Sequence, residues 1–214
     1  MCYNIEKMEG LYMVIDFTEI VDLLEPIGFI GLMLIWMSFL IGMKFPDWDF
    51  KLKIKHRNIL THSPIILWAM IYFYNTRKDA EVFRFSIMGF ALAIGLHMIF
   101  DFFPRGWARG ALIYFPYCKL CLGIKGSKGF IFFTGVYSIF LSIKYSKSYI
   151  EIIFLSLIGI YTIVKNTKKE EKFFRPFSFF TVVLLFLSAI KYNEISSSIA
   201  FVVHLISEKI KILF

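Results

Sequence analysis

Four short polar segments hold the residues that could do chemistry in this chain, and each lies beside a long apolar stretch. They are Pro46-Asp47-Trp48-Asp49, His56-Arg57, Thr61-His62-Ser63-Pro64, and the pair His97 and Asp101. Three histidines and three aspartates suit zinc, manganese or iron better than calcium, which prefers oxygen ligands alone. The predicted metal ligands are Asp47, Asp49, His56, His62, His97 and Asp101.

The spacing within two of these segments suits a shared ion. His97 and Asp101 are four residues apart, so on a helix they project from one face and can meet the same metal. Asp47 and Asp49 follow a proline in a connection. Backbone freedom there would let both carboxylates turn towards one point.

The two histidines between these segments cannot share one face of a single helix. His56 and His62 are six apart, which is out of phase on one helix, so we expect His56 on an approach loop and His62 near a helix start. Ser63 followed by Pro64 is typical of an N-cap and first-turn pair. The positive end of such a helix would point towards the site and favour an anionic substrate.

The elements that must position these residues are membrane-spanning helices. Of the 214 residues, 58% are hydrophobic and only 19% are charged. A spanning helix needs about 20 apolar residues. Apolar stretches run approximately over 27–43, 59–74, 83–103, 129–143, 149–164, 177–190 and 199–214.

We therefore predict an all-α polytopic transmembrane bundle of about six spans. An amphipathic helix over Leu11–Leu24 precedes the first span, and the last stretch is a possible seventh helix, since charges interrupt it. The chain is expected to form one membrane-embedded domain over 1–214. Within it, 27–116 would be the metal-site core and 129–214 supporting helices.

The distribution of basic residues predicts the orientation. Of the 24 Lys and Arg, 17 lie in alternate connections that begin after the first span, and the other 7 lie on the opposite side. The positive-inside rule places the larger set in the cytoplasm and the N-terminus outside. All six predicted ligands then fall on the cytoplasmic face of the cell membrane. The +8 charge is read as topological, so no nucleic-acid partner is expected.

A metal at this depth suggests hydrolysis. One or two divalent ions would lower the pKa of bound water towards about 7 and supply a nucleophile. Arg57, and less directly Arg105, could neutralise a phosphate, and we predict Arg57, Asp49 and His62 as catalytic residues. The expected partners are membrane lipids, with a lipid or amphiphilic phosphoester as substrate.

Other interpretations stay open. Asp47 and Asp49 could be solvated charges, and His97 with Asp101 could form a buried hydrogen bond that joins two helices. The protein could bind metal without catalysis, as a sensor or assembly factor. It could also be a transporter, although the ligands cluster at one end and no repeat is visible. The CxxC at Cys118 and Cys121 is interpreted as incidental.

The motifs together resemble those of the YdjM-like family of membrane-bound, predicted metal-dependent hydrolases. The matching segments are PDWD (46–49), HRNILTHSP (56–64) and HMIFDFFPRG (97–106), within residues 27–116. The resemblance implies a metal-activated hydrolase that uses the six predicted ligands. Two departures stand out: HRNILTH replaces the family's HRGxTH and is closer to a related HRxxxSHxP group of putative metal-binding membrane proteins, and Phe103 replaces a common threonine.

Overall fold

The computed structural model describes residues 28–52, 57–77, 81–103, 112–115, 120–167 and 174–193. The described residues are arranged as helices, with two isolated β-bridges and no extended strand among them. The helices are α2 (Gly28–Lys44), α3 (Trp48–Lys51), α4 (Ile65–Thr76), α5 (Glu81–Phe102), α6 (Gly123–Lys144), α7 (Tyr149–Thr167) and α8 (Phe174–Lys191). The predicted all-helical class is confirmed for this part of the chain.

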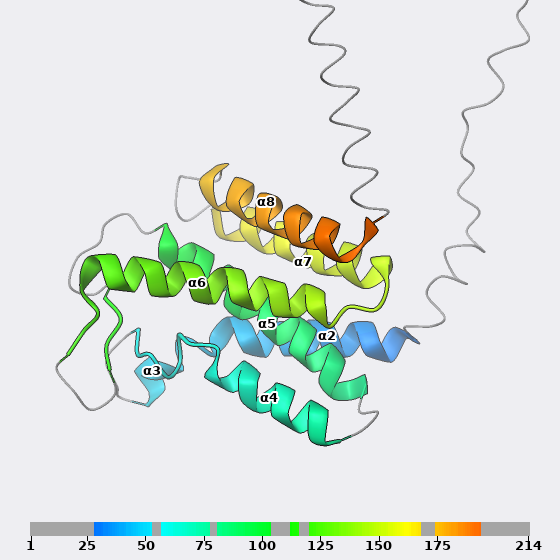
Figure 1. Ribbon diagram of the computed structural model, residues 1–214, viewed down its shortest axis with the longest axis horizontal. Coiled ribbons are helices and arrows are strands. Elements are labelled where there is room, and N and C mark those ends of the chain that lie inside the picture. The colour runs from blue at the N-terminus through cyan, green and yellow to red at the C-terminus, as the bar shows by residue number, and fades with distance from the viewer. Residues whose placement is uncertain are drawn as a thin grey trace, which may run out of the picture.

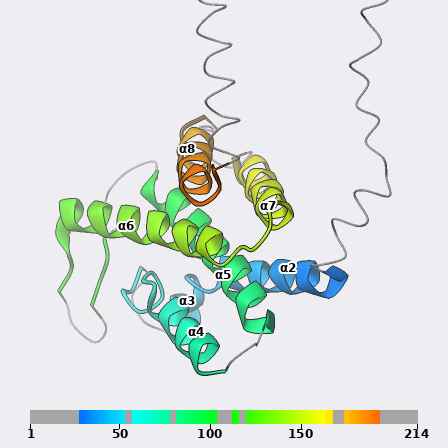
Figure 2. The same cartoon turned by 45° about the vertical axis from the view of Figure 1, so that its right-hand side comes forward.

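Helix α5 occupies the centre of the bundle. In Figures 1 and 2, α2 and α4 lie on one side of it, and α6, α7 and α8 lie on the other. It is the most buried of the four long apolar helices, whereas α8 is the least buried. Large apolar side chains are exposed on the outer helices, for example Leu157 on α7 and Val182 on α8. So much exposed apolar surface is expected of helices that face lipid.

Glycines let α5 approach its neighbours closely. A Cβ atom added at Gly89 would lie 2.1 Å from the backbone oxygen of Ile35 on α2. On the opposite side, a Cβ at Gly95 would lie 3.3 Å from the backbone oxygen of Gly135 on α6. Small residues at helix crossings are how membrane helices gain packing contacts, because lipid supplies no hydrophobic force between them.

Four helices are long and apolar enough to cross a membrane: α5, α6, α7 and α8. The predicted first and second spans are shorter, because α2 has 17 residues and α4 only 12. The apolar stretch predicted to begin at Ile59 becomes helical only at Ile65. The preceding residues form turns instead, in which the backbone N–H groups of Thr61 and His62 both donate to the Asn58 carbonyl.

A polar cluster lies at the other end of α5 from the candidate metal ligands. The Arg84 guanidinium is buried and donates to both Glu151 oxygens at 2.9 and 2.8 Å. It also donates to Glu81 at 2.5 Å and to the Tyr145 carbonyl. The Lys191 ammonium donates to three carbonyls at the end of α6, those of Ile143, Lys144 and Ser146. These contacts join α5, α6, α7 and α8.

Two predicted elements lie outside the described residues. They are the amphipathic helix over Leu11–Leu24 and the possible seventh helix over Ile199–Phe214.

Candidate metal centre

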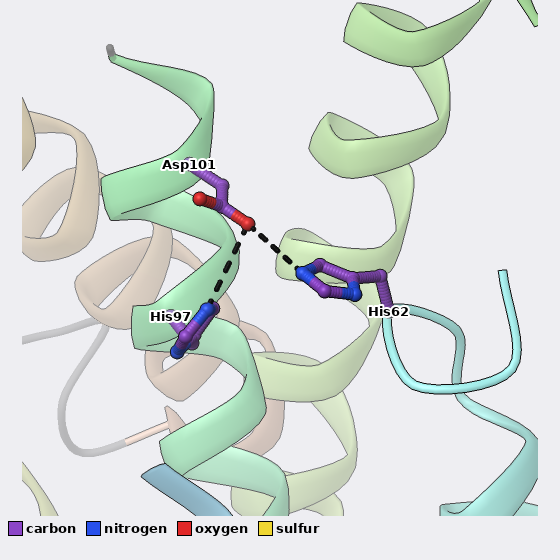
Figure 3. Close-up of side chains that lie close together, drawn as sticks. All are labelled: His62, His97 and Asp101. Atoms are coloured by element: carbon purple, nitrogen blue, oxygen red, sulfur yellow. Dashed lines mark ion pairs between the residues drawn. The ribbon is translucent and has the colours of Figure 1, made fainter. Parts of the chain in front are cut away.

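Two histidines and an aspartate from distant parts of the chain meet at one end of α5. The Nε2 atom of His62 lies 3.3 Å from Oδ2 of Asp101, and Nε2 of His97 lies 3.7 Å from the same oxygen. Figure 3 shows both imidazoles directed at this carboxylate, with His62 approaching from a loop and the other two residues on α5. One ligand atom from each residue lies within 4.8 Å of those of the other two.

The central helix aligns two of these side chains. His97 and Asp101 are separated by four residues on α5, so they project from the same face about one turn apart. Every residue from Ile87 to Leu96, just before them, is buried, so the helix lies inside the bundle. The predicted helical pairing of these two residues is therefore what the structure contains.

The orientation of His97 is fixed by a backbone carbonyl. Its Nδ1 lies 3.3 Å from the Met43 oxygen at the end of α2. A carbonyl can only accept, so this contact requires the proton on Nδ1 and leaves Nε2 of a neutral ring as a ligand atom. Metal-binding histidines commonly have their second nitrogen held in this way.

A similar arrangement orients His62. The Thr61 hydroxyl donates to the Asn58 carbonyl at 3.1 Å and lies 3.0 Å from Nδ1 of His62. Because the hydroxyl proton is used on Asn58, the oxygen can accept a hydrogen bond from Nδ1–H. The neutral His62 ring then also presents Nε2 towards Asp101.

The loop that bears His62 is anchored to the segment before α6. The backbone of Tyr114 accepts a hydrogen bond from the Ile59 N–H and donates one to the Arg57 carbonyl. The neighbouring Ile113 N–H donates to the buried Ser127 hydroxyl on α6 at 2.9 Å. These contacts hold the 57–62 loop against the bundle. They fix the position of His62, which the short loop alone would not do.

Arg57 holds the second oxygen of the aspartate. Its Nη2 atom donates to Oδ1 of Asp101 at 2.7 Å, whereas Oδ2 faces the two histidines. The guanidinium is buried, and the residue has a φ of +58°, which non-glycine residues rarely adopt. Such strained conformations cluster at functional sites. The structure thus places Arg57 as a positioning residue for Asp101, and its predicted role towards substrate stays a prediction.

The two aspartates after α2 occupy different positions. Oδ1 of Asp47 lies 3.8 Å from Nε2 of His97, at the margin of the site. Asp49 is buried, and its Oδ2 accepts the backbone N–H of Arg57 at 2.6 Å. Asp47 is therefore a candidate fourth ligand, and Asp49 stabilises the strained Arg57 backbone beside the site.

The geometry suits a transition-metal ion. Zinc holds nitrogen and oxygen ligands at about 2.0–2.1 Å in tetrahedral geometry, which separates neighbouring ligand atoms by about 3.4 Å. The separations between the histidine nitrogens and the aspartate oxygens are 3.3, 3.7 and 3.8 Å. The latter two are too long for hydrogen bonds but fit ligands around a common ion. Two imidazoles with carboxylates also match known catalytic zinc and iron donor sets.

The site opens on the side of Asp47. The side chain of His62 is fully buried, those of His97 and Asp101 are 14% and 13% exposed, and that of Asp47 is 54% exposed. A ligand reaching this centre would therefore enter past Asp47 and its neighbour Trp48, which is also exposed.

Other predicted features lie outside the described residues or differ from expectation. His56 and Arg105 lie outside the described residues. The predicted Ser63 N-cap is displaced by one residue: Pro64 occupies the N-cap position of α4, without a side-chain capping hydrogen bond. The Ser63 hydroxyl accepts a weak hydrogen bond from the Ile65 N–H at 3.4 Å. Cys121 is a free, exposed thiol, and Cys118 is not described.

Sequence reasoning missed the groups that orient the histidines. The Met43 carbonyl gives no side-chain signal, so no pattern could have indicated it. Thr61 was visible next to His62, and a hydroxyl beside a candidate ligand is a weak signal that it holds the second ring nitrogen.

Comparison of this chain with protein-family models, with curated proteins and with solved structures finds no match in any of the three.

Proposed function

We propose that the protein is a membrane-bound, metal-dependent hydrolase that acts on a lipid or amphiphilic phosphoester. The observation that carries the proposal is the convergence of His62, His97 and Asp101, whose ligand atoms lie within 4.8 Å of one another. These residues come from a loop and a central helix. The resemblance to the YdjM-like hydrolases adds support, and with no family model matching, it rests on the three motifs.

The proposed ligands are His62, His97 and Asp101, with Asp47 as a candidate fourth. A divalent zinc, manganese or iron ion held there would act as a Lewis acid that activates water and polarises an ester. The chain's own residues prepare the centre. Arg57 fixes the aspartate, while Met43 and Thr61 fix the two ring nitrogens.

The setting supports an amphiphilic substrate. Four helices are long and apolar enough to cross a membrane, and the cluster lies at one end of the central one. The proposed membrane is the cell membrane, with the site on the cytoplasmic side, which rests on the distribution of Lys and Arg. A headgroup at the membrane surface would reach such a site without leaving the bilayer.

The proposal is tested with the full chain purified in detergent. Elemental analysis measures bound zinc, manganese and iron, and release of phosphate or headgroup is measured on phospholipids with added Mn²⁺ or Zn²⁺. We expect metal and turnover in the wild type and neither in the His62→Ala, Asp101→Ala double variant. Thr76→Ala, an exposed change at the far end of α4, is the matched control and should keep both. Turnover that survives in the double variant would defeat the assignment.

A metal-binding protein without catalysis is the second candidate, and the low exposure of the three ligands favours it. The centre would then join the 57–63 loop to α5 without admitting substrate. Stoichiometric metal with no turnover on any ester tested is the result expected of this alternative. If the wild type holds no metal, the loop is joined to the helix by the hydrogen bond from Arg57 to Asp101.

A further inference from the structure

An apolar groove runs along the bundle beside the candidate metal centre. It has a volume of about 370 Å³, within the size range of small-molecule pockets. Its walls come from α2, α4 and α5, and the exposed Trp48 of α3 lies at one end. Trp48 stands between Asp47 and Asp49 in the chain, so the groove ends on the side where the metal centre opens.

The stripe of α5 that lines the groove leads directly to a metal ligand. Phe83 and Phe90 precede His97 by fourteen and seven residues, and Ser86 precedes it by eleven. At 3.6 residues per turn, Phe90 and Ser86 lie within about 20° of the helical face that bears His97, and Phe83 lies about 40° from it. On the facing side, Ser38 and Ile41 of α2 and Phe45, the residue after its end, form a second stripe at spacings of three and four.

The groove is apolar and has no charged side chain in its lining. The Ser86 hydroxyl donates to the Val82 carbonyl of its own helix at 2.7 Å. The Ser86 hydroxyl therefore has its hydrogen bond within its own helix and needs none from a ligand. A ligand in the groove is consequently held by shape and apolar contact, as a hydrocarbon chain would be.

We propose that this groove binds one acyl chain of a membrane lipid, with the lipid headgroup at the metal centre. The inference rests on the proposed function and names its substrate class as a glycerophospholipid. The length is comparable with that of one leaflet: the α5 residues that line the groove, from Val82 to Phe90, span about 12 Å at 1.5 Å per residue. One leaflet of a hydrocarbon core about 30 Å thick is about 15 Å deep.

The occupancy of the groove can be measured without turnover. The full chain is placed in phosphatidylcholine nanodiscs that contain phosphatidic acid with a photoactivatable diazirine near the end of one acyl chain. After illumination, mass spectrometry locates the labelled peptides. We expect preferential labelling of Ile41, Met70 and Phe83, which face the groove from three helices.

Two substitutions fill the groove from opposite walls, Ser86→Trp on α5 and Ser38→Trp on α2. A tryptophan side chain would occupy the volume that the acyl chain needs, so groove labelling should fall about tenfold in each variant. Leu157→Trp on the exposed face of α7 is the matched control and should leave it unchanged. Because each wall has its own variant, the test stays valid if one variant fails to fold. Circular dichroism detects such a failure.

Uniform labelling of all exposed helices would overturn the inference. An absence of groove labelling would overturn it as well, and this second result is expected if a terminal segment of the chain fills the groove. Turnover of the wild type, measured on phospholipids with added Mn²⁺ or Zn²⁺, separates the two proposals. Groove labelling of a wild type that shows no turnover supports the groove and removes the hydrolase. Turnover without groove labelling supports the hydrolase and removes the groove.

Discussion

The sharpest stability prediction concerns the buried pair of Arg84 and Glu151. The two side chains are 4% and 1% exposed, and the guanidinium donates to both carboxylate oxygens at 2.9 and 2.8 Å. Glu151→Gln keeps the size of the side chain and one oxygen for the Lys147 N–H, which Glu151 now accepts at 2.6 Å. The change therefore removes the negative charge with little loss of packing.

The magnitude follows from burial. Two unit charges about 4 Å apart attract by about 4 kcal/mol at an effective dielectric constant of 20. Breaking a buried pair by removing one partner costs about 3–5 kcal/mol, because the remaining charge stays buried. Since Glu81 still neutralises part of the Arg84 charge, we expect the lower end, about 3 kcal/mol. For a chain of this size, that lowers the melting temperature by about 6–12 °C.

The assay is thermal unfolding in detergent, followed by intrinsic tryptophan emission. Glu81→Gln is the matched control: it removes a carboxylate from the same guanidinium, but its side chain is 45% exposed. An exposed ion pair contributes only about 0–1 kcal/mol. The double change Arg84→Met, Glu151→Leu should unfold near the wild-type temperature, because apolar replacement of a buried pair is often neutral.

A melting temperature of Glu151→Gln as high as that of Glu81→Gln would refute this reasoning. A double variant less stable than Glu151→Gln would contradict it as well, since the cost would then lie in lost contacts and not in an uncompensated charge.

Two further predictions address helix packing and the site. Gly89→Ala should destabilise the protein by about 1–3 kcal/mol, because its Cβ would lie 2.1 Å from the Ile35 backbone oxygen. The control is Gly129→Ala, whose Cβ would have no atom within 4 Å. In the same thermal assay it should be neutral or stabilising by up to about 1 kcal/mol. Asp49→Ala removes the acceptor of the Arg57 N–H, so metal affinity measured by competition with a chelator should fall about 10–100-fold, whereas Asp49→Asn, which keeps an acceptor, should lose less.

Helix positions were the part of the fold that could be predicted from sequence. Long apolar runs need internally satisfied backbones in a membrane, and the described helices follow those runs. The start of α4 was predicted to within one residue by Ser63 and Pro64, whereas the apolar run from Ile59 would begin the helix too early, because the backbone of Ile59 and Leu60 belongs to turns. Apolar composition alone does not distinguish a helix from a buried turn.

Three of the six predicted ligands, His62, His97 and Asp101, come together in the structure, whereas the contacts that orient them could not be predicted from sequence. The four-residue spacing of His97 and Asp101 specified a shared helical face, and the structure adds His62 to it. The link from Arg57 to Asp101 spans 44 residues and depends on a positive φ that an arginine seldom adopts. The β-bridge from Asn58 to Tyr114 has no strand pattern around it, so periodicity could not reveal it.

The placement of polar groups on α5 has a consequence for biogenesis. From Ile87 to Leu96 the helix has no polar side chain, and its charged residues lie near its two ends. It can therefore enter the bilayer as a single segment without drawing a charge through the midplane, where charges are most costly. The proposed metal centre would form only after the 57–63 loop docks on α5, so metal uptake would report completed assembly. Metal retained by a chain whose loop cannot dock would contradict this order of events. Insertion into the membrane and metal loading would then be separate steps.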